Sequence, residues 1–314
     1  MRALVTGGAG FIGSHLVELL LTQGHQVVAL DDLSSGSADN LAAASAHPDF
    51  VFRTGSVLDD AAVAAAMDGC DVVFHLAAVV GVARVVDQPV HTLHTNAGGT
   101  EVVLTAAFGV GATFLLTSSS EVYGRNPAEK LSESADRVLG PPQVSRWSYS
   151  ESKAVAELLT LHAWREHRLP TVITRLFNTV GPRQRDMVVP RMLRQAHRGE
   201  PITVHGDGRQ TRCFCHVSDV VRALVDLAVE PRAHGAVVNV GGEQEVAMEF
   251  LARRVIAVTG SASEIRYVPY DEAYAVGFEE VRRRVPDITR ARELIGFKPT
   301  LDLDDMLRVS VAAG

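Results

Sequence analysis

The first half of the chain alternates short apolar runs with longer segments in which apolar residues recur every three or four positions. The runs have the length and the flanking turn residues of buried strands, whereas segments such as 14–24 have the spacing of helices that bury one face. Strands that alternate with helices in this way predict a parallel, doubly wound α/β sheet. The six predicted strands are residues 3–7, 26–32, 50–57, 71–78, 113–120 and 170–178.

Beyond residue 178 this alternation loosens. A chain of 314 residues is long enough for one large domain or two coupled domains. We therefore expect a first domain over residues 1–178 and a smaller C-terminal α/β lobe over 179–314, with part of that chain returning to the main sheet. The apolar pieces of the lobe are 202–208 and 236–242, and its helical segments are 189–199 and 217–229.

Composition narrows the class of protein. The net charge is −7 and no polybasic tract stands out, which argues against nucleic acid as a primary partner. Three cysteines are an odd, sparse set that fits a reducing compartment, and Cys213 and Cys215 have no second ligand pair for a metal. No run of 18 uncharged apolar residues occurs, and the apolar start is too short for a signal peptide. We expect a cytoplasmic protein without a membrane span or a metal.

A glycine-rich loop joins the first predicted strand to the first helix. Gly7, Gly10 and Gly13 have the spacing that allows a tight turn, close approach of a pyrophosphate and close packing of helix on strand. Asp31 follows about 20 residues later, at the end of the second strand, where it can accept hydrogen bonds from the adenosine ribose. Its carboxylate would repel a 2′-phosphate, and residues 16–52 contain no Lys or Arg. The pattern predicts a Rossmann domain that binds NAD rather than NADP.

Two further motifs carry candidate chemistry. Tyr149 and Lys153 are four residues apart, so a helix would place them on one face. A lysine cation beside a phenol lowers the pKa of the phenol, which makes tyrosine a usable base, although two surface residues would give the same pattern. Ser119 and Glu121 follow a buried strand, at the edge of a parallel sheet where ligands bind.

Taken together, these motifs resemble the extended short-chain dehydrogenases/reductases, and within them the NAD-dependent epimerase/dehydratase family of nucleotide-sugar enzymes. The resemblance covers almost the whole chain. One departure is Ser56, where the family usually has an aspartate. The matching segments are 5–16, 31–36, 75–78, 95–100, 118–124, 149–153, 175–184, 204–221 and 284–300.

The resemblance implies transfer of a hydride from C4 of a UDP-sugar to NAD⁺. Tyr149 would take the proton of O4, Lys153 would hold the nicotinamide ribose, and Ser119 would hydrogen-bond O4. It also implies a homodimer built from two helices, about 89–108 and 148–167. The implied cofactor contacts are Gly7, Gly10, Phe11, Ile12, Gly13, Asp31, Asp32, Ser56, Val57, Leu76, Ala77, Ala78, Asn96, Tyr149 and Lys153. The implied substrate contacts are Asn178, Val189, His205, Gln210, Arg212 and Arg284.

The residues before Val122 bear on the branch of the family. Dehydratases have Asp-Glu there, whereas Ser120 and Glu121 resemble the UDP-glucuronate decarboxylases, which also share Arg284 two residues before Pro286. This resemblance implies oxidation of UDP-glucuronate at C4, loss of CO₂ and reduction to UDP-xylose. Glu121 would organise a water that protonates C5, and Arg284 would orient the carboxylate or the diphosphate.

Alternatives remain open at this point. Glu121 could be a structural acceptor, and Arg282–Arg284 could be a solvated charge run. The enzyme could be a UDP-sugar 4-epimerase, which releases no CO₂. A protein of another class, a catalytically silent NAD-binding sensor or scaffold, is disfavoured by the intact Tyr149, Lys153 and Ser119.

Overall fold

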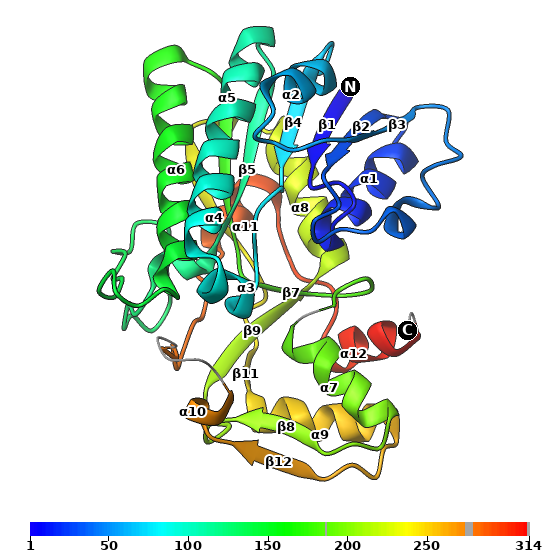
Figure 1. The fold of residues 1–314 in the computed structure, drawn as a ribbon, viewed down its shortest axis with the longest axis vertical. Helices are drawn as coiled ribbons and strands as arrows, with labels where there is room; N and C mark the ends of the chain where they lie inside the picture. The colour runs from blue at the N-terminus through cyan, green and yellow to red at the C-terminus, as the bar shows by residue number, and fades with distance from the viewer. Residues whose placement is uncertain (186, 274–278, 313–314) are drawn as a thin grey trace.

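The central feature is a parallel sheet of seven strands in the order β10-β6-β5-β4-β1-β2-β3 (Figure 1). The computed structural model describes residues 1–185, 187–273 and 279–312. The predicted fold class, a Rossmann-like parallel sheet with flanking helices, is confirmed. The strands are β1 (Arg2–Thr6), β2 (Gln26–Asp31), β3 (Phe50–Thr54), β4 (Val72–His75), β5 (Thr113–Ser119), β6 (Thr171–Leu176) and β10 (Ala236–Val240).

Helices cover both faces of this sheet. Successive side chains of a strand point to opposite faces, so Leu4 and Val5 of β1 belong to different hydrophobic cores. The Val5 core includes α1 (Phe11–Thr22), α8 (Val217–Val229) and α11 (Thr289–Ile295). The Leu4 core includes α2 (Asp60–Met67), α5 (Gly99–Val110) and α6 (Trp147–His167).

The helix predicted over 89–108 is divided into three pieces. A π-type turn, η2 (His94–Gly98), separates α4 (Pro89–Leu93) from α5. At the start of α5, a Cβ on Gly99 would lie 2.6 Å from Cγ2 of Val57, so the backbone packs directly on that loop. The remaining short elements of this half are η1 (Ala38–Leu41), α3 (Val82–Asp87) and η3 (Ser120–Tyr123).

A second, smaller set of elements lies below the carboxyl ends of the central strands in Figure 1. It contains a three-stranded sheet, β11-β9-β7, and a two-stranded sheet, β12-β8, packed with helices around a core of their own. The chain returns from it to the main sheet through β10 and α11, and the domain division between 178 and 179 remains a prediction. The elements of the lobe are β7 (Asn178–Val180), α7 (Val188–His197), β8 (Ile202–His205), β9 (Thr211–His216), β11 (Glu245–Ala247), α9 (Met248–Thr259), β12 (Ile265–Val268), α10 (Tyr270–Ala273) and α12 (Leu303–Ala312). A short helix before β10, η4 (Pro231–Ala233), packs with the main sheet.

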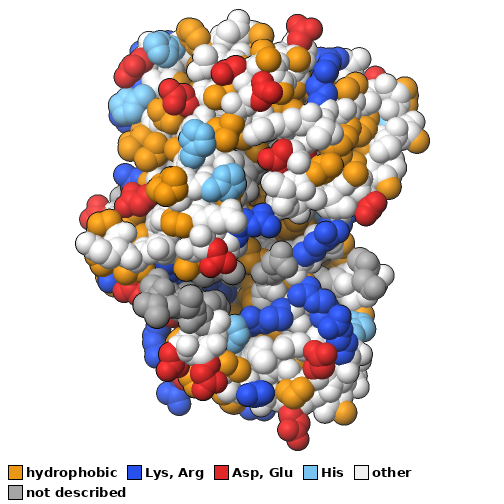
Figure 2. All heavy atoms as spheres, viewed as in Figure 1, with side chains coloured by type: hydrophobic (Ala, Val, Ile, Leu, Met, Phe, Trp, Pro, Cys, Tyr) orange, Lys and Arg blue, Asp and Glu red, His pale blue; other side chains and the backbone are white. Residues whose placement is uncertain are grey.

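The candidate site residues therefore lie at the junction of the two parts. Figure 2 shows Lys and Arg side chains on both sides of this junction. Among the described residues, no helix combines the length and the apolar character needed to cross a membrane. In the same part of the chain, no group of three His, Cys, Asp or Glu side chains is arranged to hold a metal.

Candidate active site

The glycine loop between β1 and α1 is tightly folded. Gly7 has a positive φ of 70°, and a Cβ there would lie 2.8 Å from the backbone nitrogen of Ala77. A Cβ on Gly13 would lie 2.1 Å from the carbonyl oxygen of Gly7. Gly10 precedes α1, whose first N–H groups, those of Phe11 and Ile12, have no intrahelical acceptor. A backbone cradle of this kind at a helix N-terminus fits the pyrophosphate of a dinucleotide.

Asp31 closes this cradle at the end of β2. Its Oδ2 accepts a hydrogen bond from the backbone N–H of Ala9 at 3.0 Å, and its Oδ1 accepts one from Leu33 at 2.8 Å. Burial raises the pKa of this carboxyl group, while the two backbone hydrogen bonds lower it. Each oxygen keeps a lone pair for a ribose hydroxyl. The neighbouring Asp32 is exposed and accepts from Ser34.

The other predicted cofactor residues lie at the ends of β3 and β4. Ser56 accepts a hydrogen bond from the N–H of Leu58 at 3.2 Å, and Leu76, Ala77 and Ala78 are half-buried where β4 ends. Val57 is buried.

Asn96, another predicted cofactor contact, is buried and hydrogen-bonded within the protein. Its Nδ2 donates to the carbonyl of Val79 at 3.2 Å and to Oγ of Ser152 at 3.0 Å, and its Oδ1 accepts from the N–H of Val79 at 2.7 Å. Both amide hydrogens are therefore used inside the protein. Through these hydrogen bonds, Asn96 connects the loop after β4 with α6.

Tyr149 and Ser119 meet beside the end of β5. The side chain of Ser119 lies close enough to the phenol of Tyr149 to affect its pKa. Burial raises the pKa of this phenol above its usual value, Ser119 lowers it, and the nearby charge of Glu121 raises it further. Lys153 follows Tyr149 by one turn of α6, and its expected effect on the pKa of the phenol stays a prediction. Its Nζ donates to the carbonyl of Thr117 at 2.8 Å, and burial lowers its pKa to about 8.

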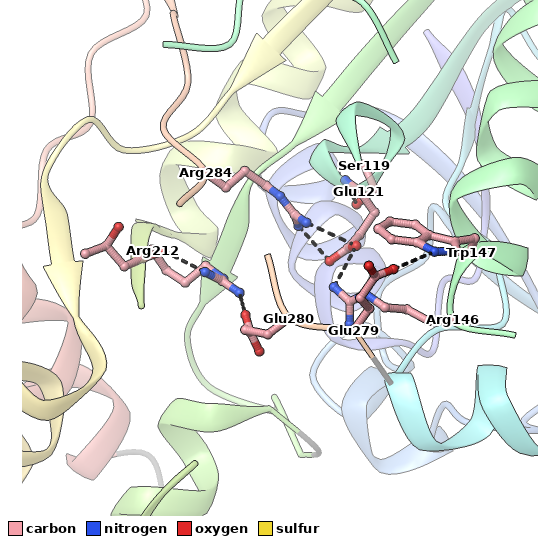
Figure 3. A network of polar contacts seen from close by, with 9 residues as sticks. Ser119, Glu121, Arg146, Trp147, Arg212, Glu279, Glu280 and Arg284 are labelled. Carbon is pink, nitrogen blue, oxygen red and sulfur yellow. Dashed lines mark hydrogen bonds and ion pairs between the residues drawn. The ribbon is translucent and has the colours of Figure 1, made fainter. Parts of the chain in front are cut away.

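Glu121 binds two arginines (Figure 3). Its Oε1 accepts from Nη1 of Arg284 at 2.6 Å, and its Oε2 accepts from Nη2 of Arg284 and Nη2 of Arg146, both at 3.2 Å. Burial alone would raise the pKa of this carboxyl group, but Arg284 and Arg146 outweigh it and hold the pKa at about 2. Glu121 is therefore ionised at neutral pH and is a very weak base.

The three arginines of the predicted charge run, Arg282–Arg284, differ in how deeply they are buried. Arg282 and Arg283 are exposed and pair with Asp207 and Glu245 on the surface, whereas the side chain of Arg284 is only 3% exposed. The solvated-run interpretation thus describes the first two arginines and not the third.

Arg212 of β9 lies on the lobe side of the same site. Its Nη2 donates to Glu280, and its Nη1 donates to the carbonyl of Thr211 at 2.7 Å. Burial lowers the pKa of Arg212, while Glu280 raises it. The ion pair of Arg212 and Glu280 joins the segment after residue 278 to the lobe. It lies next to Arg146 and Arg284, the arginines that bind Glu121.

The remaining predicted substrate residues belong to the lobe. Asn178 is half-buried at the start of β7, and Val189 packs in the lobe core at the start of α7. Gln210 donates from Nε2 to the carbonyl of His205 at 2.8 Å, and its Oε1 is buried without a partner. Burial and the charge of Arg191 lower the pKa of His205 to about 4, so its ring is neutral at pH 7.

A protein-family model described as "NAD dependent epimerase/dehydratase family" matches residues 3–241. The chain belongs to this family. The predicted family is thereby confirmed, and NAD is its cofactor, which agrees with the cradle formed by the glycine loop and Asp31.

Individual members resemble the chain over its whole length. It is 37% identical to a UDP-N-acetyl-alpha-D-glucosaminuronate decarboxylase of Bacillus cytotoxicus, over 99% of this chain and 96% of that one. It is 39% identical to a UDP-glucuronic acid decarboxylase of Arabidopsis thaliana, over 98% and 87%. The crystal structure of a UDP-glucuronic acid 4-epimerase from Bacillus cereus, bound to UDP-glucuronic acid and NAD, has a TM-score of 0.89 and 29% identity over 100% and 98%.

Several residues of the candidate site were not predicted from the sequence. Arg146 stands three residues before Tyr149, so helical spacing could have placed both on one side of α6. No sequence pattern indicated that Glu280 or Glu279 belongs to the site. Glu279 accepts a hydrogen bond from Nε1 of Trp147 at 3.1 Å.

Glu157, one turn after Lys153, was also missed. It accepts from Arg175 through both oxygens, at 2.9 and 2.7 Å, and from Ser118 at 2.6 Å. Its charge raises the pKa of Lys153 against the effect of burial. The buried carboxylate of Glu157 therefore holds Ser118 and Arg175 in place behind Ser119 and Lys153.

Proposed function

We propose that the protein is an NAD-dependent UDP-glucuronate decarboxylase that forms UDP-xylose and CO₂. The observation that carries this proposal is the contact between Glu121 and the buried Arg284, directly beside Ser119 and Tyr149. The curated relatives of Bacillus and Arabidopsis, which are named decarboxylases of nucleotide-linked uronates, support it.

The residues of the chain would act on the sugar at C4 and C5. NAD⁺, held by the glycine loop and Asp31, would supply the hydride acceptor for C4 and the hydride donor for the later reduction. Tyr149 takes the proton of O4 when C4 is oxidised. The resulting β-keto acid breaks its C5–C6 bond, and the electron pair moves into the C4 carbonyl while CO₂ leaves. Ser119 and Tyr149 can donate hydrogen bonds to the enolate oxygen, and C5 then takes up one proton from water. When C4 is reduced again, Tyr149 gives back to O4 the proton that it had taken.

Two alternatives have observations of their own. The Bacillus cytotoxicus relative is named for a sugar with an N-acetyl group, so UDP-N-acetylglucosaminuronate is a second candidate substrate. The similarity to the solved UDP-glucuronic acid 4-epimerase favours epimerisation at C4 as the second candidate reaction. A silent NAD-binding protein would need no pair of buried arginines on a carboxylate beside the tyrosine.

The deciding experiment incubates the NAD-loaded protein with each UDP-uronate and with UDP-glucose, follows the products by NMR and traps released CO₂. Release of CO₂ with formation of a UDP-pentose supports the decarboxylase. Conversion of UDP-glucuronate to UDP-galacturonate without release of CO₂ would refute the decarboxylase and identify the protein as a 4-epimerase. The Tyr149→Phe variant, prepared in the same way, controls for contaminating enzymes.

We also propose that the protein is a C₂ homodimer that pairs through α5 and α6. Figure 2 shows hydrophobic and histidine side chains over these helices. Phe108 and Leu158 are 53% and 45% exposed, beside a surface hollow of about 460 Å³ that they line. Ala154 and Ala163, two other apolar residues of α6, are instead buried within the chain. Light scattering at micromolar concentration should give a dimer and Leu158→Glu a monomer; a monomeric wild type would refute the pairing.

Cytoplasmic localisation remains a prediction. It is supported by the three cysteines, all of which are free in the structure.

A further inference from the structure

The buried face of α6 carries two charged side chains, those of Lys153 and Glu157, which are one helical turn apart. Nζ of Lys153 donates a hydrogen bond to the carbonyl of Thr117 at 2.8 Å. Oε1 of Glu157 accepts one from Oγ of Ser118 at 2.6 Å. Because Thr117 and Ser118 are consecutive residues of β5, the charged ends of the two side chains lie close together. Lys153 and Glu157 are only 3% and 6% exposed, so salt and water screen their attraction weakly.

A second cation, Arg175 of β6, also binds the carboxylate of Glu157. Nε and Nη2 of Arg175 donate to its two oxygens at 2.9 and 2.7 Å. The same guanidinium lies over the ring of Tyr123, 4.7 Å from its centroid, and donates to the carbonyl of Glu133 at 3.2 Å. Glu157 thus lies beside two buried cations, Arg175 and Lys153. Its removal would leave them to repel each other where little water can enter, and buried charges without a counter-charge are costly.

Other titratable groups near Lys153 lie on β4, α6 and η3. His75 of β4 is fully buried, and burial together with the charge of Lys153 lowers the pKa of its ring to about 3, so the ring is neutral. Burial and the charge of Glu121 on η3 raise the pKa of the Tyr149 phenol, which is therefore protonated at neutral pH. Burial lowers the pKa of Lys153 to about 8, and the charge of Glu157 raises it against this effect. Glu157 therefore opposes the loss of the Lys153 proton.

We propose that Glu157 is a positioning residue that keeps the ammonium group of Lys153 charged and in place for hydride transfer. The charge matters because a cation beside Tyr149 favours the ionised phenol that accepts the proton of O4. This inference rests on the proposed function for the use of Tyr149 and Lys153 in the oxidation at C4. Since the decarboxylase and the 4-epimerase both begin with this oxidation, it does not depend on the later fate of the sugar.

The test measures the titration of Lys153 directly. The chain has three lysines, Lys130, Lys153 and Lys298, so protein labelled with ¹³C at the lysine ε-carbons gives three NMR signals. Loss of one signal in Lys153→Arg assigns it. In NAD-loaded protein, Glu157→Gln should move the titration of this signal to lower pH by about one unit or more, because the opposite charge is lost. A merely loosened structure would admit water and move it the other way, toward the usual value of 10.5.

The same helix offers a matched control. Glu151 is an exposed carboxylate two residues before Lys153, and Glu151→Gln should leave the titration of Lys153 unchanged. Glu157→Asp, which keeps the charge, should shift the titration less than Glu157→Gln does. If Glu157→Gln does not fold, Glu157→Leu combined with Arg175→Met removes both charges of the ion pair, a replacement that proteins often tolerate. This double variant should also lower the pKa of Lys153, because it leaves the ammonium group in apolar surroundings.

Kinetics provide the second readout. In Glu157→Gln, the fall of kcat/KM at high pH should move to lower pH together with the NMR titration, while KM for the UDP-sugar stays within about threefold. The proposal is overturned if Lys153 titrates at the same or a higher pH in the variant that removes the Glu157 charge, or if Glu151→Gln lowers its pKa equally. The proposed function fails separately, if the wild type releases no CO₂ from UDP-uronates, because the NMR titration requires no turnover.

Discussion

Replacing Glu121 by glutamine should destabilise the folded protein at neutral pH. The two arginines hold the pKa of this carboxyl group at about 2 against the opposing effect of burial, and its usual value is 4.5. At about 1.4 kcal/mol for each pH unit, the ionised carboxylate contributes about 3 kcal/mol to the free energy of unfolding. The amide of Glu121→Gln keeps the shape of the side chain and removes the negative charge that Arg146 and Arg284 share.

The pH dependence follows from the direction of the shift. Because the pKa is lower in the folded state, the contribution of Glu121 is complete above about pH 4.5 and is lost as the pH falls from there toward 2. Urea unfolding, followed by the fluorescence of Trp147 and Trp164, should show a constant difference between wild type and variant from about pH 7 to 5.5. The difference should shrink as the pH falls below about 4.5.

The surface pair of Glu245 and Arg283 provides the control. It is also bidentate, with distances of 2.8 and 2.9 Å, but it lies on the exposed side of the lobe. Glu245→Gln should therefore cost about 1 kcal/mol or less. The reasoning is refuted if Glu121→Gln costs no more than this control at pH 7, or if its cost is undiminished at about pH 3.5.

Three further predictions concern the cofactor and the hydride chemistry. Asp31→Ala should weaken NAD about ten- to hundredfold in calorimetry, because a charge-assisted hydrogen bond is lost; tighter binding of NADP than of NAD by the wild type would contradict the role of Asp31. Tyr149→Phe should lower turnover about 10²- to 10⁴-fold while the circular dichroism stays that of the wild type, and near-normal turnover would remove Tyr149 from the mechanism. Burial lowers the pKa of Lys153 to about 8, so kcat/KM should fall as the pH rises through that value, and Lys153→Arg should abolish this limb; a profile that is flat to pH 10 would show that the charge of Lys153 is not required.

The architecture was predictable because it depends on periodicity along short stretches. Each predicted strand overlaps a strand of the central sheet, and the helix predicted at 217–229 has the bounds of α8. The division of the helix over 89–108 was not predictable in this way. The spacing of apolar residues does not mark the turn, and the packing of Gly99 on Val57 joins two residues that are far apart in the sequence.

The charged residues of the site show the same limit. Glu121 and Arg284 were both recognised, but they are separated by 163 positions, and no local pattern indicates that they bind each other. For Tyr149 and Lys153 the spacing was read correctly, and only the folded structure shows that the ammonium group turns to Thr117. Spacing thus predicts which residues share a helix face, whereas the partner of a charge is decided by tertiary packing.

The low pKa of Glu121 constrains the protonation of C5. A carboxylate with a pKa of about 2 carries almost no proton at neutral pH, so in the ligand-free protein Glu121 is a poor relay. A uronate carboxylate that bound to Arg284 would weaken the hold of this arginine on Glu121 and add a like charge beside it, and both effects raise the pKa. We therefore expect the Glu121 carboxyl carbon, assigned in ¹³C NMR by its loss in Glu121→Gln, to titrate at higher pH when NAD-loaded Tyr149→Phe protein binds UDP-glucuronate than when it binds UDP. If the pKa stays near 2 with the uronate bound, Glu121 does not carry the C5 proton, and its part in the reaction is to hold the arginines.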